Sequence, residues 1–301
     1  MGKYSIIVFH WYKIMSSKNL FLTSGIFVFI WSSGFIVGRL IVGSVSPNIF
    51  LGIRFFCTAI LFAFIAHMLK KTYPKYTEIP KHIIIGILCN GIYLGGSYWA
   101  INNGMPAGIM ALLGGLQPLF TLIFASLFFA EPFRINYTFC IILGLLGIYL
   151  SLPLSINNNY NFLVILISIL SIISITLGLL FQKHYTQSSE LIPSLVIQNI
   201  SGAFISLLLV IFLQEKTVIL GFNFWFSLFW AVIVLSGLGI YLLMKLAQNN
   251  NAVKVTSLML LCPPLAAIQA NLLFKEQLSL LQICGFFLAL LGVALCQKVK
   301  T

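Results

Sequence analysis

The sequence predicts an all-α polytopic membrane protein, with ten transmembrane helices arranged as two inverted five-helix repeats. Composition, a duplicated stretch and the spacing of apolar runs lead to this prediction. Hydrophobic residues make up 60% of the chain and charged residues 7%, whereas a soluble domain is about 25% charged. So few charges could not cover the surface of a soluble protein of 301 residues. The expected solvent for most of the chain is therefore lipid.

The duplicated stretch is marked by a proline, a glutamate and a glycine that recur with the same spacing. The landmarks lie thirteen and sixteen residues apart in both copies: Pro118, Glu131 and Gly147, then Pro263, Glu276 and Gly292. An internal period of about half the chain length indicates a duplicated unit.

Apolar runs of about 20 residues follow one another along the chain. They are 20–40, 46–69, 82–101, 108–130, 135–153, 162–182, 191–213, 223–246, 252–274 and 279–297. These runs are continuous rather than alternating, and only helices or closed barrels satisfy their backbone groups in lipid, so helices are expected. Five helices fall in each repeat.

The predicted organisation follows from these runs. It comprises an N-terminal extension (1–19), the first repeat (20–153), a linker (154–161), the second repeat (162–297) and a short C-terminus (298–301). The apolar stretch Ile6–Phe9 in the extension is too short to span a bilayer. Two interpretations of the extension stay open: it lies on the membrane surface, or translation starts at Met15.

The distribution of basic residues predicts the orientation. An odd number of helices per repeat places the second repeat upside down in the bilayer. With the N-terminus inside, thirteen of the 17 basic residues fall on the cytoplasmic side and three on the outer side, while Arg54 lies within a helix. The positive-inside rule then places both termini in the cytoplasm. Inverted repeats of this kind are typical of secondary transporters.

Several motifs resemble the drug/metabolite transporter superfamily and, within it, the EamA-type family. They are Met105-Pro106-Ala107-Gly108-Ile109, Gly115-Leu116-Gln117-Pro118-Leu119, Glu131, Pro263, Glu276 and Gly292, with Trp31-Ser32-Ser33-Gly34-Phe35 in the first run and Pro47 with Arg54-Phe55 in the second. The resemblance covers about residues 20–297. It implies a ten-helix carrier for small organic molecules, often moving them outward, in a bacterial cytoplasmic (inner) membrane. It also implies a cavity lined by helices one, three, four, six, eight and nine.

Arg54 is a cation inside a predicted membrane helix, with no acid nearby in the sequence. It lies some 12 Å deep, which is deep for a side chain that snorkels to the interface. Binding of an anionic substrate group is the other interpretation. The second half carries Ile200 at the place taken to be equivalent, so the repeat itself does not require the charge.

Polar and aromatic residues supply the other candidates for substrate binding. They are Trp31, Ser32, Ser33, Asn90, Tyr93, Ser97 and Gln117 in the first half, with Tyr241 and Ser257 in the second. Asn90, Tyr93 and Ser97 share one helical face, and small-molecule pockets combine apolar walls with a few polar groups. The competing interpretation, an interfacial aromatic belt, is favoured for Tyr98, Trp99, Trp225 and Trp230.

Structural or gating roles are expected for residues at the helix breaks and helix ends. They are Gly114, Gly115, Pro118, Glu131, Pro263, Pro264 and Glu276. Gly/Pro interruptions at matching places in two halves indicate a transporter's binding site, although a packing kink explains them too. The two glutamates end their helices, where carboxylates favour the positive end of the following helix.

No metal or cofactor is predicted. The six cysteines sit in apolar runs without a CxxC pair, and the four histidines form no HxxxH motif. The expected partners are a small-molecule substrate and the lipid bilayer, without nucleic acid. A homodimer is one of the oligomeric states left open.

The favoured function is a secondary transporter, with export as the expected direction, of small neutral or zwitterionic metabolites such as amino acids. No acid is predicted at the membrane centre, so facilitated diffusion or exchange is expected rather than coupling through a buried carboxylate. The alternative within membranes is a lipid or lipid-linked flippase. An intramembrane enzyme would need clustered catalytic groups, which the sequence lacks. A purely structural membrane subunit fits the matched helix breaks less well.

Overall fold

The computed structural model describes residues 3–105, 107–130, 135–151, 161–186, 189–239, 241–243, 246, 258–274 and 280–298. Side chains are described from residue 22 onward, with further gaps around residues 106–112, 131–137 and 259–298. Of the predicted site residues, Glu131, Ser257 and Glu276 lie outside the described residues, as does the side chain of Pro263.

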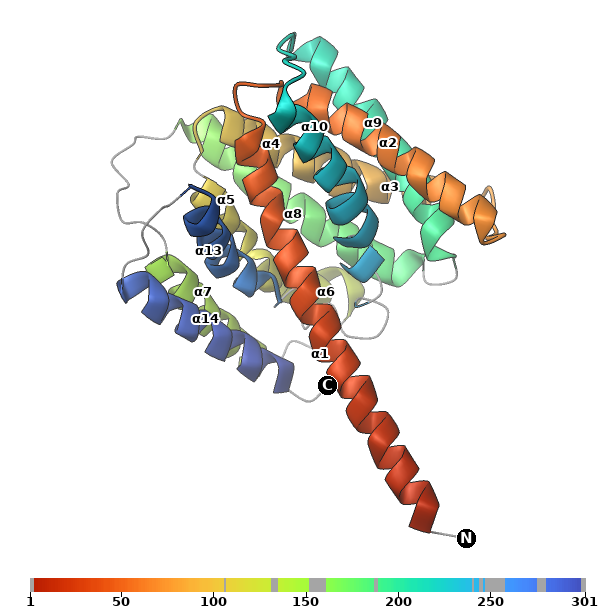
Figure 1. Cartoon of the computed structure of the whole chain (residues 1–301), viewed down its shortest axis with the longest axis vertical. Coiled ribbons are helices and arrows are strands. Elements are labelled where there is room, and N and C mark those ends of the chain that lie inside the picture. Colours follow the sequence, from red (N-terminus) through yellow and green to blue (C-terminus); the bar gives the residue numbers. More distant parts are fainter. Residues whose placement is uncertain are drawn as a thin grey trace.

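The described chain forms helices throughout, joined by short loops (Figure 1). The first half contains α1 (Lys3–Leu40), α2 (Pro47–Met68), α3 (Ile79–Gly86), the π-helical segment η1 (Ile87–Ile92), α4 (Tyr93–Asn102), α5 (Ala107–Gly114), α6 (Gln117–Phe129) and α7 (Ile135–Ser151). The second half contains α8 (Phe162–Tyr185), α9 (Leu191–Phe212), α10 (Phe222–Phe229), the π-helical segment η2 (Trp230–Gly239), the 3₁₀ segment η3 (Leu258–Leu261), α13 (Cys262–Phe274) and α14 (Leu280–Lys298).

Six helical spans are long and apolar enough to cross a membrane. They are Leu22–Ile41, Pro47–Met68, Ile79–Asn102, Phe162–Tyr185, Leu191–Phe212 and Phe222–Leu243. Shorter apolar helices cover Gln117–Phe129, Thr138–Gly147, Pro264–Leu273 and Ile283–Gly292. The all-α prediction and the multi-pass membrane prediction are confirmed, while the count of ten spanning helices is not.

The first helix is longer than predicted. It begins at Lys3, so the segment predicted as a separate extension continues the first apolar run as one helix. In Figure 1 the N-terminal part of α1 projects beyond the rest of the molecule.

Helices of equal length recur in the two halves. α2 and α9 both have 22 residues, α3 and α10 both have eight, and α6 and α13 both have 13. α2 and α9 also end alike, because Lys70 and Gln214 adopt left-handed φ angles of 49° and 51° two residues after each helix. A left-handed residue at this place closes a helix.

The fourth apolar run is broken rather than continuous. α5 ends at Gly114, and α6 starts at Gln117 with Pro118 in its first turn. A proline is tolerated there because the N–H groups of a first turn have no partner within the helix. The matching place in the second half is also irregular, since the 3₁₀ segment η3 leads directly into α13, whose first turn holds Pro263 and Pro264.

The core is built mainly by the six long spans, whereas α7 and α14 form a pair at one side (Figure 1). These two helices cross closely at Gly144 and Gly292. A Cβ atom at Gly292 would lie 2.6 Å from the backbone nitrogen of Gly144. The landmark Gly292, predicted from the repeat, therefore permits contact between two helix backbones.

Candidate functional site: a buried cavity with an arginine

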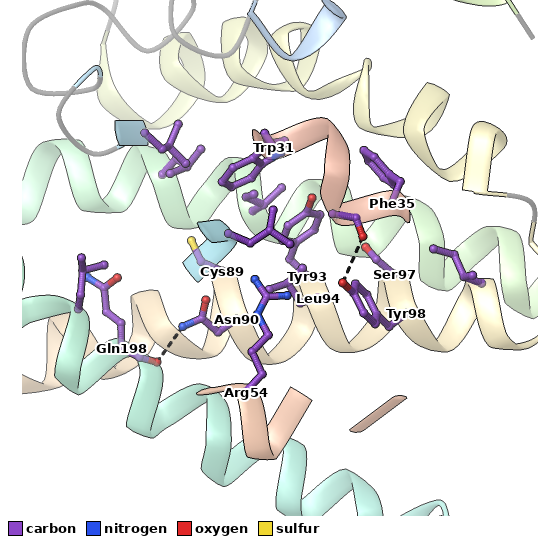
Figure 2. A pocket seen from close by; sticks show the side chains of 17 residues that line it. Trp31, Phe35, Arg54, Cys89, Asn90, Tyr93, Leu94, Ser97, Tyr98 and Gln198 are labelled. Carbon is purple, nitrogen blue, oxygen red and sulfur yellow. Dashed lines mark hydrogen bonds between the residues drawn. The ribbon is translucent and has the colours of Figure 1, made fainter. Parts of the chain in front are cut away.

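A cavity of about 60 Å³ lies among the six long spans (Figure 2). About 10–15 Å³ of such space holds one water molecule, so the cavity has room for a few waters or part of a small solute. Its lining residues are Trp31, Gly34, Phe35, Arg54, Cys89, Asn90, Tyr93, Leu94, Ser97, Tyr98, Ile101, Ile175, Leu179, Leu195, Gln198, Leu235 and Leu243. Three of the contributing spans come from each half of the chain, so the cavity is shared between the halves.

Arg54 supplies the positive charge of the cavity. α2 carries it inward to a place where only 3% of its surface is exposed, so the side chain does not reach an interface. Its Nε–H donates a hydrogen bond of 2.8 Å to Ser236 Oγ of η2, and its guanidinium lies 5.8 Å from the centre of the Phe55 ring. Figure 2 shows the guanidinium pointing toward Tyr93 and Leu94.

No carboxylate among the described residues accompanies this charge. The titratable neighbours that interact with the guanidinium most strongly are the phenols of Tyr98 and Tyr93. The three described glutamates, Glu78, Glu190 and Glu215, accept hydrogen bonds in the loops instead. Arg54 is thus a buried cation surrounded by neutral groups.

The π-helical segment η1 shapes one wall. A π-helix adds a residue to a helical turn, and such segments often occur at functional sites. Cys89 and Asn90 of η1 line the cavity, and the Asn90 side-chain amide donates a hydrogen bond of 3.1 Å to the backbone oxygen of Gln198 (Figure 2). This hydrogen bond joins the third span to α9 across the two halves.

α4 places three polar side chains on the same wall. The Tyr98 hydroxyl donates a hydrogen bond of 3.2 Å to the backbone oxygen of Gly34. The Tyr93 side chain is buried beside it. Ser97 is 4% exposed, and its Oγ has no hydrogen-bond partner among the described residues. A buried hydroxyl without a partner is costly, so Ser97 offers a polar group to whatever occupies the cavity.

The structure brings five of the predicted binding residues together in the cavity: Trp31, Arg54, Asn90, Tyr93 and Ser97.

Four other predicted binding residues do not line the cavity. Ser32 and Ser33 join helices: Ser32 Oγ accepts a hydrogen bond from Gln269, and Ser33 Oγ accepts one from the Trp230 indole. Gln117 is buried in the first turn of α6, and Tyr241 is 36% exposed outside the cavity. Small hydroxyls and amides in membrane helices commonly hold helices together, which explains the placement of the two serines.

The expected set of lining helices needs correction. Helices two and seven, α2 and α9, contribute Arg54, Leu195 and Gln198, whereas none of the described lining residues comes from the helices that carry Pro118 and Pro264. Those prolines lie in the first turns of α6 and α13, which supply none of the described lining residues. Sequence reasoning gave these prolines too large a role in the binding site. Helix breaks at matching places can be recognised in the sequence, whereas the direction in which a helix face points cannot.

Sequence reasoning also chose the wrong residue of the second half as the counterpart of Arg54. Arg54 is the eighth residue of α2, and the eighth residue of α9 is Gln198, which lines the same cavity. Ile200, taken to be equivalent, is 55% exposed and faces away from the core. Counting from the helix starts pairs Arg54 with Gln198, whereas the offset between the Pro–Glu–Gly landmarks leads to Asn199.

Two further residues of the site were not predicted. Tyr98 was assigned to an interfacial belt but is buried in the cavity wall. Ser236, which holds the Arg54 guanidinium, carried no sequence signal because a lone serine in an apolar run usually packs between helices.

Hydrogen-bonded loops connect the two halves at the start of α2. Glu215 accepts hydrogen bonds from the backbone N–H of Asn48 at 2.9 Å, from its side-chain amide at 2.7 Å and from the backbone N–H of Ile49 at 3.3 Å. An isolated β-bridge between Val45 and Val218 lies beside these bonds. We call this group of contacts the Glu215 clasp. A carboxylate at a helix N-terminus satisfies N–H groups that lack intrahelical partners.

A second set of contacts lies at the opposite end of α2. Lys71 Nζ is 3.1 Å from Glu190 of the loop before α9, and the Thr72 hydroxyl donates to the same carboxylate at 3.0 Å. The hydrogen bonds from Lys71 and then Thr72 hold the pKa of Glu190 below its ordinary value. Ser189 Oγ donates to Glu78 at 3.1 Å in the same region. We call this group the Glu190 clasp.

The fold and the site define the class of protein: a multi-pass helical membrane protein with a cavity, mainly apolar but holding a buried arginine, between two similar halves, as in membrane transporters. The model of the EamA-like transporter family matches residues 21–152 and 162–296. The chain therefore belongs to the EamA-like transporter family, and it is a membrane transporter rather than an enzyme, as predicted.

The names of relatives agree with this assignment, and a solved structure shares the fold. A "Probable amino-acid metabolite efflux pump" of Salmonella typhimurium is 24% identical over 291 residues, covering 93% of this chain and 94% of its own length. The "Uncharacterized transporter YvbV" of Bacillus subtilis is 22% identical over 276 residues, covering 89% and 88%. A crystal structure of a protein with 15% sequence identity superimposes with a TM-score of 0.75 over 91% of this chain and 94% of that chain. That likeness shows the fold.

Proposed function

We propose that this transporter is a carrier that exports small organic metabolites, amino acids and related solutes foremost, through the cavity between its halves. The observation that carries the proposal is that both halves line one buried cavity, with Arg54 and Gln198 at the same place in equivalent helices. The names of similar efflux pumps support amino-acid metabolites as the first solutes to test.

The proposed architecture is ten transmembrane helices in two inverted five-helix repeats, residues 20–153 and 162–297, joined by the linker 154–161. The four shorter apolar helices would complete the six long spans. Matched helix lengths, matched left-handed residues and the double match to the family model support the repeat. Both termini are placed in the cytoplasm because of the distribution of basic residues. The relatives from Bacillus subtilis and Salmonella typhimurium support a bacterial inner membrane.

The proposed mechanism is alternating access by rocking of the two halves. The Glu215 clasp and the Glu190 clasp lie at opposite ends of α2, so opening one end while the other stays closed would expose the cavity to one side at a time. The wide turns of η1 and η2 beside the cavity are suited to absorbing the movement, because π-helical hydrogen bonds deviate from the regular helical pattern.

A counterflow assay in proteoliposomes tests the function. Liposomes that hold the purified protein are loaded with an unlabelled amino-acid mixture and diluted into traces of the labelled amino acids. We expect uptake that exceeds protein-free liposomes and that falls in Tyr93→Ala, whose ring lines the cavity. Tyr241→Ala is the matched control, because Tyr241 lies outside the cavity. Movement of labelled phospholipid across the bilayer without any solute counterflow would instead support the flippase alternative.

A further inference from the structure

The cavity holds a positive charge that no carboxylate among the described residues balances. A charged side chain in the low-dielectric interior of a membrane protein is costly, and it is retained where a partner or a function compensates for it. Arg54 is almost fully buried, and no described carboxylate interacts with it. Its cavity is therefore suited to a ligand that brings one negative charge.

The guanidinium also keeps unused hydrogen-bonding capacity. An arginine side chain has five N–H donors in a fixed fork that matches the two oxygens of a carboxylate. The Nε–H is engaged with Ser236, and the Tyr98 phenol also forms a hydrogen bond with the guanidinium. Among the described residues, these bonds leave further N–H groups of the fork for a ligand. The serine fixes the orientation of the fork while its terminal amino groups remain directed at the cavity (Figure 2).

We infer that Arg54 binds a carboxylate of the transported solute, so that the substrates of this carrier carry one carboxylate. This inference rests on the proposed carrier function and specifies its substrate class. The Ser97 hydroxyl, buried without a partner in the same wall, is a second donor for a bound oxygen.

The lining indicates what the rest of the solute is like. Apart from Arg54 and the polar groups Asn90, Ser97 and Gln198, it consists mainly of apolar and aromatic side chains, such as Ile175, Leu179 and Leu195. The aromatic rings of Trp31 and Tyr93 line the cavity, and rings of this kind attract an ammonium group through cation–π interaction. Arg54 is the only cation among the described lining residues, so a second anionic group of the solute would have no positive partner there. This excludes dianions such as phosphate monoesters as the preferred ligand. A lipid headgroup fits poorly, because the guanidinium is not exposed on the lipid-facing surface.

The first experiment uses the wild-type chain in detergent micelles and measures the thermal unfolding midpoint. The probes are the protein amino acids and matched analogues of alanine, leucine and phenylalanine. The acids without the amino group are propionate, 4-methylpentanoate and 3-phenylpropionate, and the amines without the carboxylate are ethylamine, isoamylamine and phenethylamine. We expect amino acids and acids of suitable size to raise the midpoint, and amines to leave it unchanged.

The second experiment compares two variants, each of which replaces one arginine by glutamine and so removes one positive charge. Arg54→Gln should weaken carboxylate binding by about 10- to 100-fold, the effect of losing hydrogen bonds to a charged group. Glutamine is the residue at the equivalent place in α9, so the change is compatible with this helix environment. Arg39→Gln, at the exposed end of α1, should bind like the wild type.

The inference is overturned if amines stabilise the wild type as well as the acids do, or if no carboxylate-bearing probe stabilises it. Stabilisation by phosphatidylglycerol alone, added as mixed micelles, overturns it as well. Unchanged carboxylate preference in Arg54→Gln refutes the role of Arg54 but leaves the carrier function intact. A wild-type protein without counterflow of any solute refutes the proposed function itself.

Discussion

At the scale of single residues, the two halves of the cavity differ by one charge. Arg54 and Gln198 occupy the same place in α2 and α9, yet only the first is a cation. Gln198 is engaged with its own half, since its amide donates a hydrogen bond of 2.7 Å to Gln182. Specificity for charge is therefore carried by the first half. The second half supplies a neutral wall, which is apolar except for Gln198, and the Ser236 hydroxyl that binds Arg54.

Ser236 is expected to act as a positioning residue for Arg54. Ser236→Ala removes one hydrogen bond to the guanidinium, which corresponds to about 0.5–1.5 kcal/mol. We expect the KM for the transported carboxylate to rise about two- to tenfold, with the maximal rate unchanged. Ser236→Thr should restore the KM, because it keeps the hydroxyl. The matched control is Ser227→Ala, a buried serine of the same span that does not contact Arg54. An equal KM increase in this control would contradict a specific role for Ser236.

At the scale of helices, the third span of each half has the same construction. Eight α-helical residues lead into a π-helical segment, as α3 leads into η1 and α10 leads into η2. Residues of both segments line the cavity, Asn90 in η1 and Leu235 in η2. π-helical segments are uncommon, so their recurrence at matching places indicates that they are a shared structural feature of the two repeats.

The Glu215 clasp is expected to stabilise the start of α2. Glu215→Gln keeps the size of the side chain but removes its negative charge from a helix N-terminus, an interaction of about 1 kcal/mol. We expect a lower thermal unfolding midpoint in detergent. Lys216→Gln, a charge change at the neighbouring loop residue, serves as the control and should leave the midpoint nearly unchanged. Equal midpoints for both variants would show that the clasp does not stabilise the fold.

The crossing of α7 and α14 is expected to tolerate no side chain at Gly292. Gly292→Leu forces the two helix backbones apart, and overpacking of this kind costs about 1–3 kcal/mol or more. Lower expression and a lower unfolding midpoint should follow. Gly25→Ala is the comparison, because a Cβ atom at this position of α1 meets no atom within 4 Å. Wild-type stability of Gly292→Leu would contradict the close crossing.

At the scale of the whole molecule, the fold was largely predictable from the sequence, whereas the site was predictable only in part. Membrane helices have a length and composition that can be counted along the chain, and each predicted apolar run overlaps a helix of the structure. Arg54 and Asn90 stood out as polar groups in apolar runs. Gln198 stood out less, as one of several polar residues of the second half, and Ser236 did not stand out. Selecting them requires the rotation of α9 and of η2 about their axes, which depends on packing against other helices.

Transport is expected to be independent of a proton gradient. The three described glutamates lie in loops or at helix ends, and none interacts with the cavity. With the membrane potential clamped by potassium and valinomycin, counterflow at a pH difference of one unit should match counterflow without it within about twofold. Strict dependence on the gradient, abolished in Glu131→Gln, would show instead that a carboxylate outside the described residues couples protons to transport.

The unpaired charge of Arg54 has a consequence for the energetics of the transport cycle. When the bound solute is a simple monocarboxylate, the loaded cavity is neutral and the empty cavity carries one positive charge. After release outside, the empty carrier must turn inward with this charge. An inside-negative voltage favours that step by up to about 2.3 kcal/mol per 100 mV for one charge that crosses the full field. The resting voltage of a cell would therefore return the empty carrier to its inward-facing state. It would drive export of such anions without coupling to the gradient of another ion.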